Sequence, residues 1–284
     1  NINGGSVDSV YGAASGTTIG GDVNISVQNA TVSSITAGGC GISNGPTPAV
    51  VNGSTNIVIG SNAVISNNVY GGGWGDGASW PTVIKGNSNI TLVGNATVGG
   101  TITGTGWNSE YDIVEGVKTL NLGTSEQAYN GTSALKVADF DKINVSAGST
   151  AQIEGITQNL SGSILGTRTS IAKGGKLEVL GDVVNNITDA TNEGSFVGGL
   201  TGGEAVVSGT VKTVIDGENT ALHFVYGGNG GNQQTVLGRT EPIGTSKVGA
   251  VELTVNNGKI DMIVASGAMY SDVDGNVSLN INGG

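Results

Sequence analysis

The sequence predicts an all-β chain wound as a parallel β-helix, or β-solenoid, of about nine coils of roughly 31 residues each. Three observations predict it: a segment that recurs at a nearly fixed interval, strands that alternate apolar and polar residues, and glycine-rich corners between strands. Each coil is too thin to bury a core alone, so neighbouring coils must complete it.

The recurring segment opens with Asn-Ile and continues with β-branched residues. One copy runs from Gly53 as Gly-Ser-Thr-Asn-Ile-Val-Ile, and a second copy starts 33 residues later at Gly86. Because Asn24, Asn56 and Asn89 recur at one phase, we expect them to stack, each amide bonding the next. A third strong copy opens at Asn24, and weaker copies start near these residues: Leu120, Ile143, Lys176, Val211, Val251 and Val277.

A second feature, one or two glycines after an apolar or aromatic pair, trails several of these strands. It occurs at these places: Val10-Tyr11-Gly12, Val69-Tyr70-Gly71-Gly72, Phe196-Val197-Gly198-Gly199 and Val225-Tyr226-Gly227-Gly228. We interpret it as a later strand that ends in a tight corner. Glycine is expected there because it tolerates positive φ.

Composition favours a narrow core. Gly accounts for 52 of the 284 residues, whereas Pro, which central strands exclude, occurs four times. The chain has three Trp, three Phe and two Met. Stacked Val, Ile, Leu and Ala fill a slim solenoid without many large side chains. No Gly-X-Y period exists, so the glycine content is not that of collagen.

Charge and cysteine content exclude several classes. The formal net charge of −11 argues against nucleic acid and against an anionic membrane surface. A single cysteine excludes an internal disulfide, and a single histidine excludes a Cys/His zinc site. No apolar stretch reaches the length of a membrane span, and no signal peptide is visible.

The two ends of the chain match. Asn1-Ile2-Asn3-Gly4-Gly5 returns as Asn280-Ile281-Asn282-Gly283-Gly284, at an offset of 279 residues. Neither end has the polar cap that an isolated solenoid needs. We therefore expect residues 1–284 to form one solenoid domain open at both ends, which is a segment of a longer repetitive chain or one unit of a fibre. In a fibre, copies stack through residues near Asn1–Val10 and Gly275–Gly284.

The repeat Gly-x-x-Asn-Ile-x-[Val/Ile/Leu]-x-x-x-Ala-x-[Val/Ile], followed by Val-Tyr-Gly-Gly-Gly, resembles those of bacterial surface adhesins with right-handed β-helix passengers, autotransporter-like or haemagglutinin-like. The resemblance concerns the style of repeat over the whole chain rather than a motif with a known site. It implies a right-handed coil and an exported, extracellular shaft at the cell surface, structural or adhesive.

The tryptophans suggest a glycan-binding patch. Trp74 and Trp80 flank a glycine-rich loop that contains Asp76, and Trp107 follows one coil later in phase, close to Tyr111. Aromatic faces beside carboxylates can grip sugar rings, so host or matrix glycans are the expected ligands. The alternative is that these aromatics fold over the loop and cover a hydrophobic edge.

A second candidate site is a partial Ca²⁺ loop formed by Asp272, Asp274 and Asn276. Ca²⁺ needs six to eight oxygen ligands, and the bidentate Glu that closes an EF-hand loop is missing, so backbone carbonyls would have to complete the site. The alternative is an acidic turn between coils. His223 has no proposed partner and is expected on a strand surface.

The rival function is a polysaccharide-binding or polysaccharide-degrading β-helix of the pectate-lyase-like kind. Such enzymes need carboxylates that converge on one groove with a basic residue. Arg168 and Arg239 are the only arginines, and they lie many residues apart. No Asp cluster recurs on one face, so we expect no catalytic residues.

Overall fold

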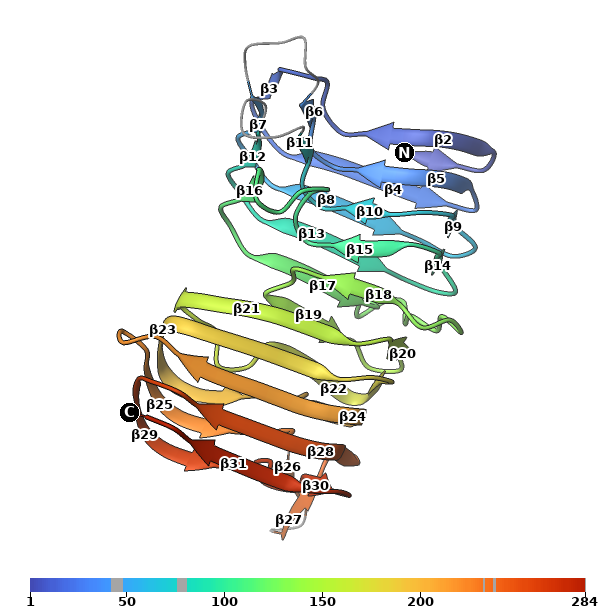
Figure 1. Ribbon diagram of the computed structural model, residues 1–284. Helices are drawn as coiled ribbons and strands as arrows, with labels where there is room; N and C mark the ends of the chain where they lie inside the picture. The colour runs from blue at the N-terminus through green and yellow to red at the C-terminus, as the bar shows by residue number, and fades with distance from the viewer. Residues whose placement is uncertain (42–47, 76–80, 232, 237–238, 284) are drawn as a thin grey trace. The chain divides into compact units, whose positions relative to one another are not determined.

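The computed structural model describes residues 1–41, 48–75, 81–231, 233–236 and 239–283 (Figure 1). These residues form β-strands and no helix, which confirms the all-β prediction. Their strands stack in parallel sheets, apart from one antiparallel pair. This arrangement is consistent with a β-solenoid. The chain divides into two compact units, Asn1–Asn144 and Val145–Gly284.

The first unit stacks its strands in four parallel sheets. The first sheet comprises β1 (Ile2–Asn3), β4 (Val23–Gln28), β8 (Thr55–Ile59), β13 (Ser88–Leu92) and β17 (Lys118–Leu122). The second comprises β2 (Ser6–Tyr11), β5 (Thr31–Thr36), β9 (Val64–Ile65), β10 (Val69–Tyr70), β14 (Thr97–Val98), β15 (Thr101–Thr103) and β18 (Lys136–Ala138). The third comprises β3 (Thr18–Ile19), β7 (Ala49–Val51), β12 (Thr82–Ile84) and β16 (Asp112–Val114). The fourth pairs β6 (Cys40–Gly41) with β11 (Trp74–Gly75).

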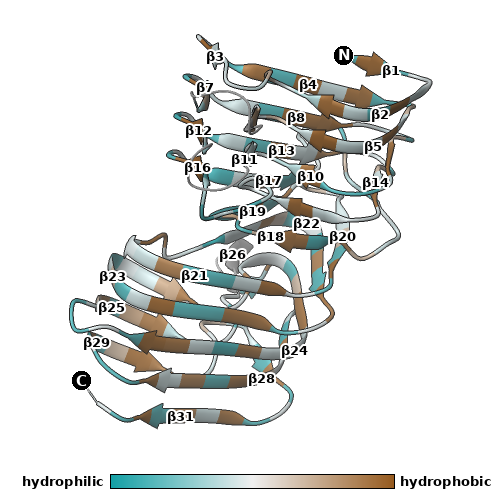
Figure 2. Ribbon diagram, turned by 45° about the horizontal axis from the view of Figure 1, so that its top comes forward, coloured by the Kyte–Doolittle hydropathy of each residue, from teal (hydrophilic) through white to brown (hydrophobic). Residues whose placement is uncertain are grey.

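We call each successive stretch of chain that adds one layer of strands to the stack, such as residues 55–84, a rung. Register within the first sheet is residue for residue between rungs. Ile57 lies opposite Ile25 and Ile90, and the column continues at Leu120. All four side chains are buried. The alternation that places them inside is visible as bands of hydropathy along the strands in Figure 2. The unit's core is therefore a set of aliphatic columns.

The predicted asparagine stack is confirmed on the outer side of this sheet. Asn56 lies opposite both Asn24 and Asn89. Its Nδ2 donates to Oδ1 of Asn24 at 3.0 Å, and Nδ2 of Asn89 donates to Oδ1 of Asn56 at 2.9 Å. The partners are 32 and 33 residues apart. These amides therefore link successive rungs in the same direction as the backbone ladder.

A second asparagine ladder, which the sequence analysis did not identify, runs along the turn after the first sheet. Asn62 donates to Asn29 at 3.1 Å, and Asn95 donates to Asn62 at 2.9 Å. Asn29 and Asn62 adopt positive φ, a conformation that asparagine tolerates better than most residues. The same residue type therefore both makes the turn and bonds the next rung.

The glycine corners are where predicted, but the expected reason for them was wrong. Gly71, Gly72 and Gly73 are absent from the described residues with positive φ. They are required because there is no room for a side chain: a Cβ on Gly71 would lie 2.0 Å from Oγ of Ser88, and one on Gly73 would lie 2.2 Å from Oγ1 of Thr82. The chain thus passes close to its own interior at this corner.

The second unit is built from strands of 2 to 15 residues, several of them longer than any strand of the first unit. They are β20 (Thr150–Ile153), β21 (Ile156–Ser163), β22 (Thr169–Val179), β23 (Val183–Val197), β24 (Gly202–Asp216), β25 (Ala221–Tyr226), β28 (Ser246–Val255), β29 (Lys259–Val264), β30 (Asp272–Val273) and β31 (Val277–Ile281). The antiparallel pair is β26 (Gln233–Val236) with β27 (Arg239–Pro242). β19 (Lys142–Val145) lies at the division between the units.

Register in the second unit corrects one expected strand start. Val211 lies opposite Val183 and Val251, and Val251 lies opposite Val277, so these valines form one column. Lys176 belongs to a different column, opposite Glu204. The strand equivalent to Val211 in the preceding rung therefore starts at Val183, not at Lys176. Partners here lie as few as 26 to 28 residues apart, so the interval is not uniform.

The described residues contain no helix long and apolar enough to cross a membrane.

Candidate ligand-binding surfaces

The aromatic patch is the surface that best matches a predicted site. Trp74 lies in β11, where its backbone pairs with Cys40, and Trp107 lies in the loop between β15 and β16. The two indole rings lie 5.6 Å apart with an interplanar angle of 30°. The Tyr70 ring lies 6.4 Å from that of Trp74. Trp107 is 51% exposed, whereas Tyr70 is buried. The structure thus brings two predicted residues together and adds Tyr70.

The loop that carries Trp107 is fastened to β11 by a buried carboxylate, Asp112. Its Oδ1 accepts hydrogen bonds from the Gly75 amide at 2.6 Å and from the Thr82 hydroxyl. Its Oδ2 accepts a hydrogen bond from the backbone N–H of Asn108 at 2.8 Å. Asp112 is 1% exposed. Because Gly75 follows Trp74 and Asn108 follows Trp107, this one side chain fixes the spacing of the two indoles.

The other predicted members of the patch divide into two groups. Tyr111 lies in the same loop, and its pKa is raised because its hydroxyl bonds the Glu110 carboxylate and the negative charge there disfavours a phenolate. Asp76 and Trp80 lie outside the residues that the structure describes. The patch is therefore defined here by Tyr70, Trp74 and Trp107.

The predicted Ca²⁺ ligands lie on an exposed stretch. Asp272 lies in β30 opposite Lys247, and the Asp274 amide donates to the Val248 carbonyl oxygen. Asp272, Asp274 and Asn276 are all exposed. Among the described residues, no group of three or more His, Cys, Asp or Glu side chains is placed to hold a metal ion. The three residues remain a prediction for Ca²⁺.

His223 has a partner that the sequence analysis did not find. Its Nδ1 lies 2.6 Å from Oδ2 of Asp261, across the pairing of β25 with β29. Both side chains are nearly half exposed. The two residues are 38 positions apart, so nothing in the local sequence connects them. The histidine lies on a strand surface, as expected.

Comparison of the chain with protein-family models, with curated proteins and with solved structures gave no match.

Proposed function

We propose that this chain is a non-catalytic, extracellular shaft of a bacterial surface adhesin or surface filament. The shaft is a right-handed β-solenoid of about nine coils of roughly 31 residues, open at both ends. The 284 residues act as one structural domain, continued by further copies of the repeat or by other copies of the chain.

The observation that carries this proposal is the unbroken register of the first sheet. Four successive strands pair residue for residue from Ile25 through Ile57 and Ile90 to Leu120. The buried columns and the two asparagine ladders repeat the same contact between rungs. Stability of such a stack is a sum of nearest-neighbour contacts, so its length can grow with repeat number without a new core. That property suits a spacer or a load-bearing fibre.

The proposal is tested on the cells that make the protein. Antibodies raised against the purified chain should label intact cells, and brief external proteolysis of those cells should remove the label. Labelling that needs permeabilised cells would overturn the extracellular assignment. In parallel, the chain should release no product from pectin-type polysaccharides, with or without Ca²⁺. Product release would favour the enzymatic alternative.

A second candidate function, adhesion to glycans, rests on the aromatic patch. Two indoles 5.6 Å apart, one of them half exposed, offer apolar faces on which a sugar ring can stack. The expected ligands are host or matrix glycans. A glycan array probed with the wild type and with a Trp74→Ala, Trp107→Ala double variant tests it. Binding that is absent from the wild type, or unchanged in the variant, removes the proposal.

The Ca²⁺ proposal has its own test. If Asp272, Asp274 and Asn276 hold Ca²⁺ with backbone carbonyls, added Ca²⁺ should raise the melting temperature, because a ligand that binds only the folded state stabilises it. The Asp274→Asn variant should lose that increase. An equal response of the wild type and the variant would assign any Ca²⁺ effect to another place.

A further inference from the structure

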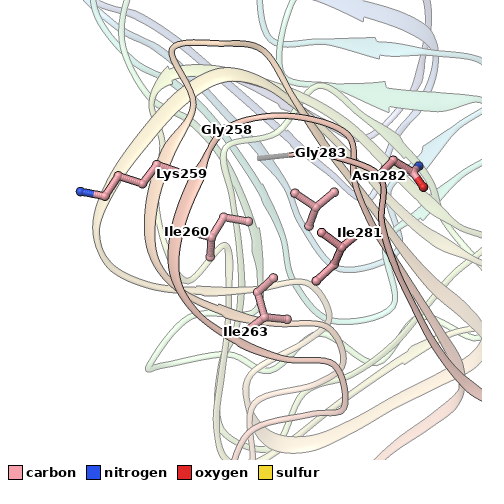
Figure 3. Close-up of a pocket in the computed structure, with 8 residues that line it drawn as sticks. Gly258, Lys259, Ile260, Ile263, Ile281, Asn282 and Gly283 are labelled. Carbon is pink, nitrogen blue, oxygen red and sulfur yellow. The ribbon is translucent and has the colours of Figure 1, made fainter.

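The last rung of the second unit has an apolar edge with which no further described strand pairs. Among the described strands, β29 pairs only with β25, and β31 pairs only with β28. A pocket of about 540 Å³ opens between them. Figure 3 shows Ile260, Ile263 and Ile281 pointing into this space, whereas Lys259 points away from it. Ile281 is 63% exposed. This edge has the backbone groups and the apolar side chains to accept one more parallel strand.

The start of the chain has the layout of the strand that would come next. β2 and β29 each contain six residues, and the first five follow the same order of exposure, with Val7 and Val10 at the positions of Ile260 and Ile263. Each strand follows directly after a glycine of positive φ, Gly5 at +80° and Gly258 at +107°.

The equivalence extends back into the preceding strand. Ile2 pairs in β1 with Val27, and Val255 pairs at the end of β28 with Ile281. The next residue is Asn in both places, and its side-chain oxygen accepts a hydrogen bond from an asparagine of the next rung: Asn3 from Asn29 at 3.4 Å, and Asn256 from Asn282 at 2.9 Å. Residues 2–12 therefore repeat the arrangement of residues 255–265.

We propose that β2 of one copy of this chain adds in parallel to the free edge of β29 of a second copy, with Val7 beside Ile260 and Val10 beside Ile263. Val10 and Ile263 would then extend the column that runs through Phe196 and Val225. Such a joint is heterologous, because the two partners use different surfaces, and it repeats without closing. It rests on the proposed shaft and names the partner and the register of its end-to-end contact.

The matching pentapeptides oppose this joint. Ile2 and Ile281 occupy equivalent strand positions, so at the joint they claim one place. One of the two segments must therefore move aside. The Asn282 backbone N–H donates a hydrogen bond to the Val255 carbonyl oxygen at 2.8 Å, and the Gly4 backbone N–H donates one to the Gln28 carbonyl oxygen at 3.0 Å. Deleting residues 280–284 removes the competitor and should strengthen the association.

A like-charge pair also opposes the joint and reports its register. In this register Asp8 lies beside Asp261, and like charges directly opposite each other on neighbouring strands destabilise the pairing. Asp8→Lys should therefore tighten the association at low salt. Adding Asp261→Lys to that variant should abolish the gain, because two lysines then face each other. His223 pairs with Asp261 within one copy, so the double variant also loses that exposed contact.

The experiment measures association of the full chain by sedimentation over a wide range of concentration. Val10→Glu and Ile263→Glu should each prevent end-to-end assembly, because each places a charge in the apolar contact between β2 and β29. Mixed together they should form a dimer, since each retains one intact surface. Leu180→Glu, at a more exposed aliphatic residue outside β2 and β29, is the control and should associate as the wild type does.

Three results would overturn the inference. One is a chain that stays monomeric even after residues 280–284 are deleted. Another is association that persists in both glutamate variants. The third is a pair of folded variants, checked by circular dichroism, that fail to complement each other. If a glutamate variant does not fold, the two lysine variants still decide the register. Cell-surface labelling does not depend on association, so the failure of this joint and the failure of the proposed function remain distinguishable.

Discussion

Asn56 donates a hydrogen bond through Nδ2 to Oδ1 of Asn24 at 3.0 Å, although 32 residues of chain separate them. Asn56 also accepts one from Asn89 at 2.9 Å, so it is the middle member of a three-residue ladder. Each amide side chain is thereby used in the same direction as the backbone ladder beside it. Contacts of this kind join equivalent positions of neighbouring rungs and so hold the rungs in register.

Replacement of the middle asparagine should cost more than replacement of an end one. Asn56→Ala removes two ladder bonds, whereas Asn24→Ala removes one. With a net contribution of about 0.5–1.5 kcal/mol for each bond, Asn56→Ala should destabilise the chain by about 1–3 kcal/mol and Asn24→Ala by about half as much. Chemical denaturation of the two variants gives the comparison. Equal losses would mean that the number of ladder bonds removed does not set the loss of stability.

The glycine before each first-sheet strand offers a matched pair of substitutions. A Cβ on Gly53 would lie 2.2 Å from Oδ1 of Asp22 and 2.6 Å from the Gly21 carbonyl carbon, whereas a Cβ on Gly21 would meet nothing within 4 Å. Gly53 stacks on the rung that contains Gly21, with its amide 3.3 Å from the Gly21 carbonyl oxygen.

Gly53→Ala should therefore lower the melting temperature markedly, since the backbone of two rungs must separate to admit the methyl group. Gly21→Ala should be neutral, or stabilising by about 0.4–1 kcal/mol through the unfolded state. Thermal unfolding measures both. A loss in Gly21→Ala as large as that in Gly53→Ala would show that close approach between rungs is not the reason for glycine.

The first unit could be predicted in detail because its rungs repeat both residue type and spacing. Asn24, Asn56 and Asn89 share a phase, and that phase is the structural register. The second unit was harder to predict, because β24 pairs with β22 over its first half and with β23 over its second half. Its register with β28 also shifts, between Val207 and Thr210. The alternation of apolar and polar residues cannot show which half of a long strand is equivalent to a short strand of another rung. For this reason Lys176, and not Val183, was wrongly predicted as the equivalent of Val211.

The aromatic patch was predicted in part. Trp74 and Trp107 share a phase in the sequence, and their rings are in contact. The role of Asp112 could not be predicted, because its three donors come from two backbone amides and one hydroxyl in three separate stretches of chain. His223 and Asp261 were missed for a related reason, since the pair of strands β26 and β27 is inserted between them.

Tyr129 should limit stability in alkali. Burial raises its pKa from 10.0 to about 12, because the folded protein disfavours a phenolate at this place. The raised pKa contributes stability that is complete below pH 10 and is lost as the pH rises towards 12, up to about 3 kcal/mol. The free energy of unfolding of the wild type should fall over that range, and that of Tyr129→Phe should fall less. Identical slopes would contradict the assignment.

Asp182 should contribute on the acid side. Its carboxylate bonds Nζ of Lys212 at 2.6 Å and the Thr210 amide at 2.8 Å, and these contacts lower its pKa below 3.8. A lowered carboxyl pKa supplies stability above pH 3.8 that is lost as the pH falls further. Both side chains are 39% exposed, so solvent screens the pair and the effect should be small.

The check on Asp182 is the slope of unfolding free energy against pH between neutral pH and pH 2. Asp182→Asn keeps an oxygen that can accept from the Thr210 amide but removes the charge, so its acid limb should be shallower than that of the wild type. High salt should reduce the difference between the two proteins. If the substitution left the slope at acid pH unchanged, the loss of stability at low pH would have to come from other carboxylates.

Asp112 should control glycan binding without touching the ligand. Asp112→Ala leaves the Gly75 and Asn108 amides and the Thr82 hydroxyl without their acceptor, and buried donors left unpaired cost about 1–3 kcal/mol each. The loop that presents Trp107 should then loosen. The expected result is weaker glycan binding together with a more mobile Trp107, read as lower indole fluorescence anisotropy. Asp112→Asn retains an acceptor oxygen and should lose less of both the glycan binding and the anisotropy.

Trp107→Phe is the matched control, since it keeps the loop anchored and changes only the exposed ring. It therefore separates loss of position from loss of stacking area. If Asp112→Ala left both anisotropy and binding intact, the carboxylate would not be what holds the two indoles together.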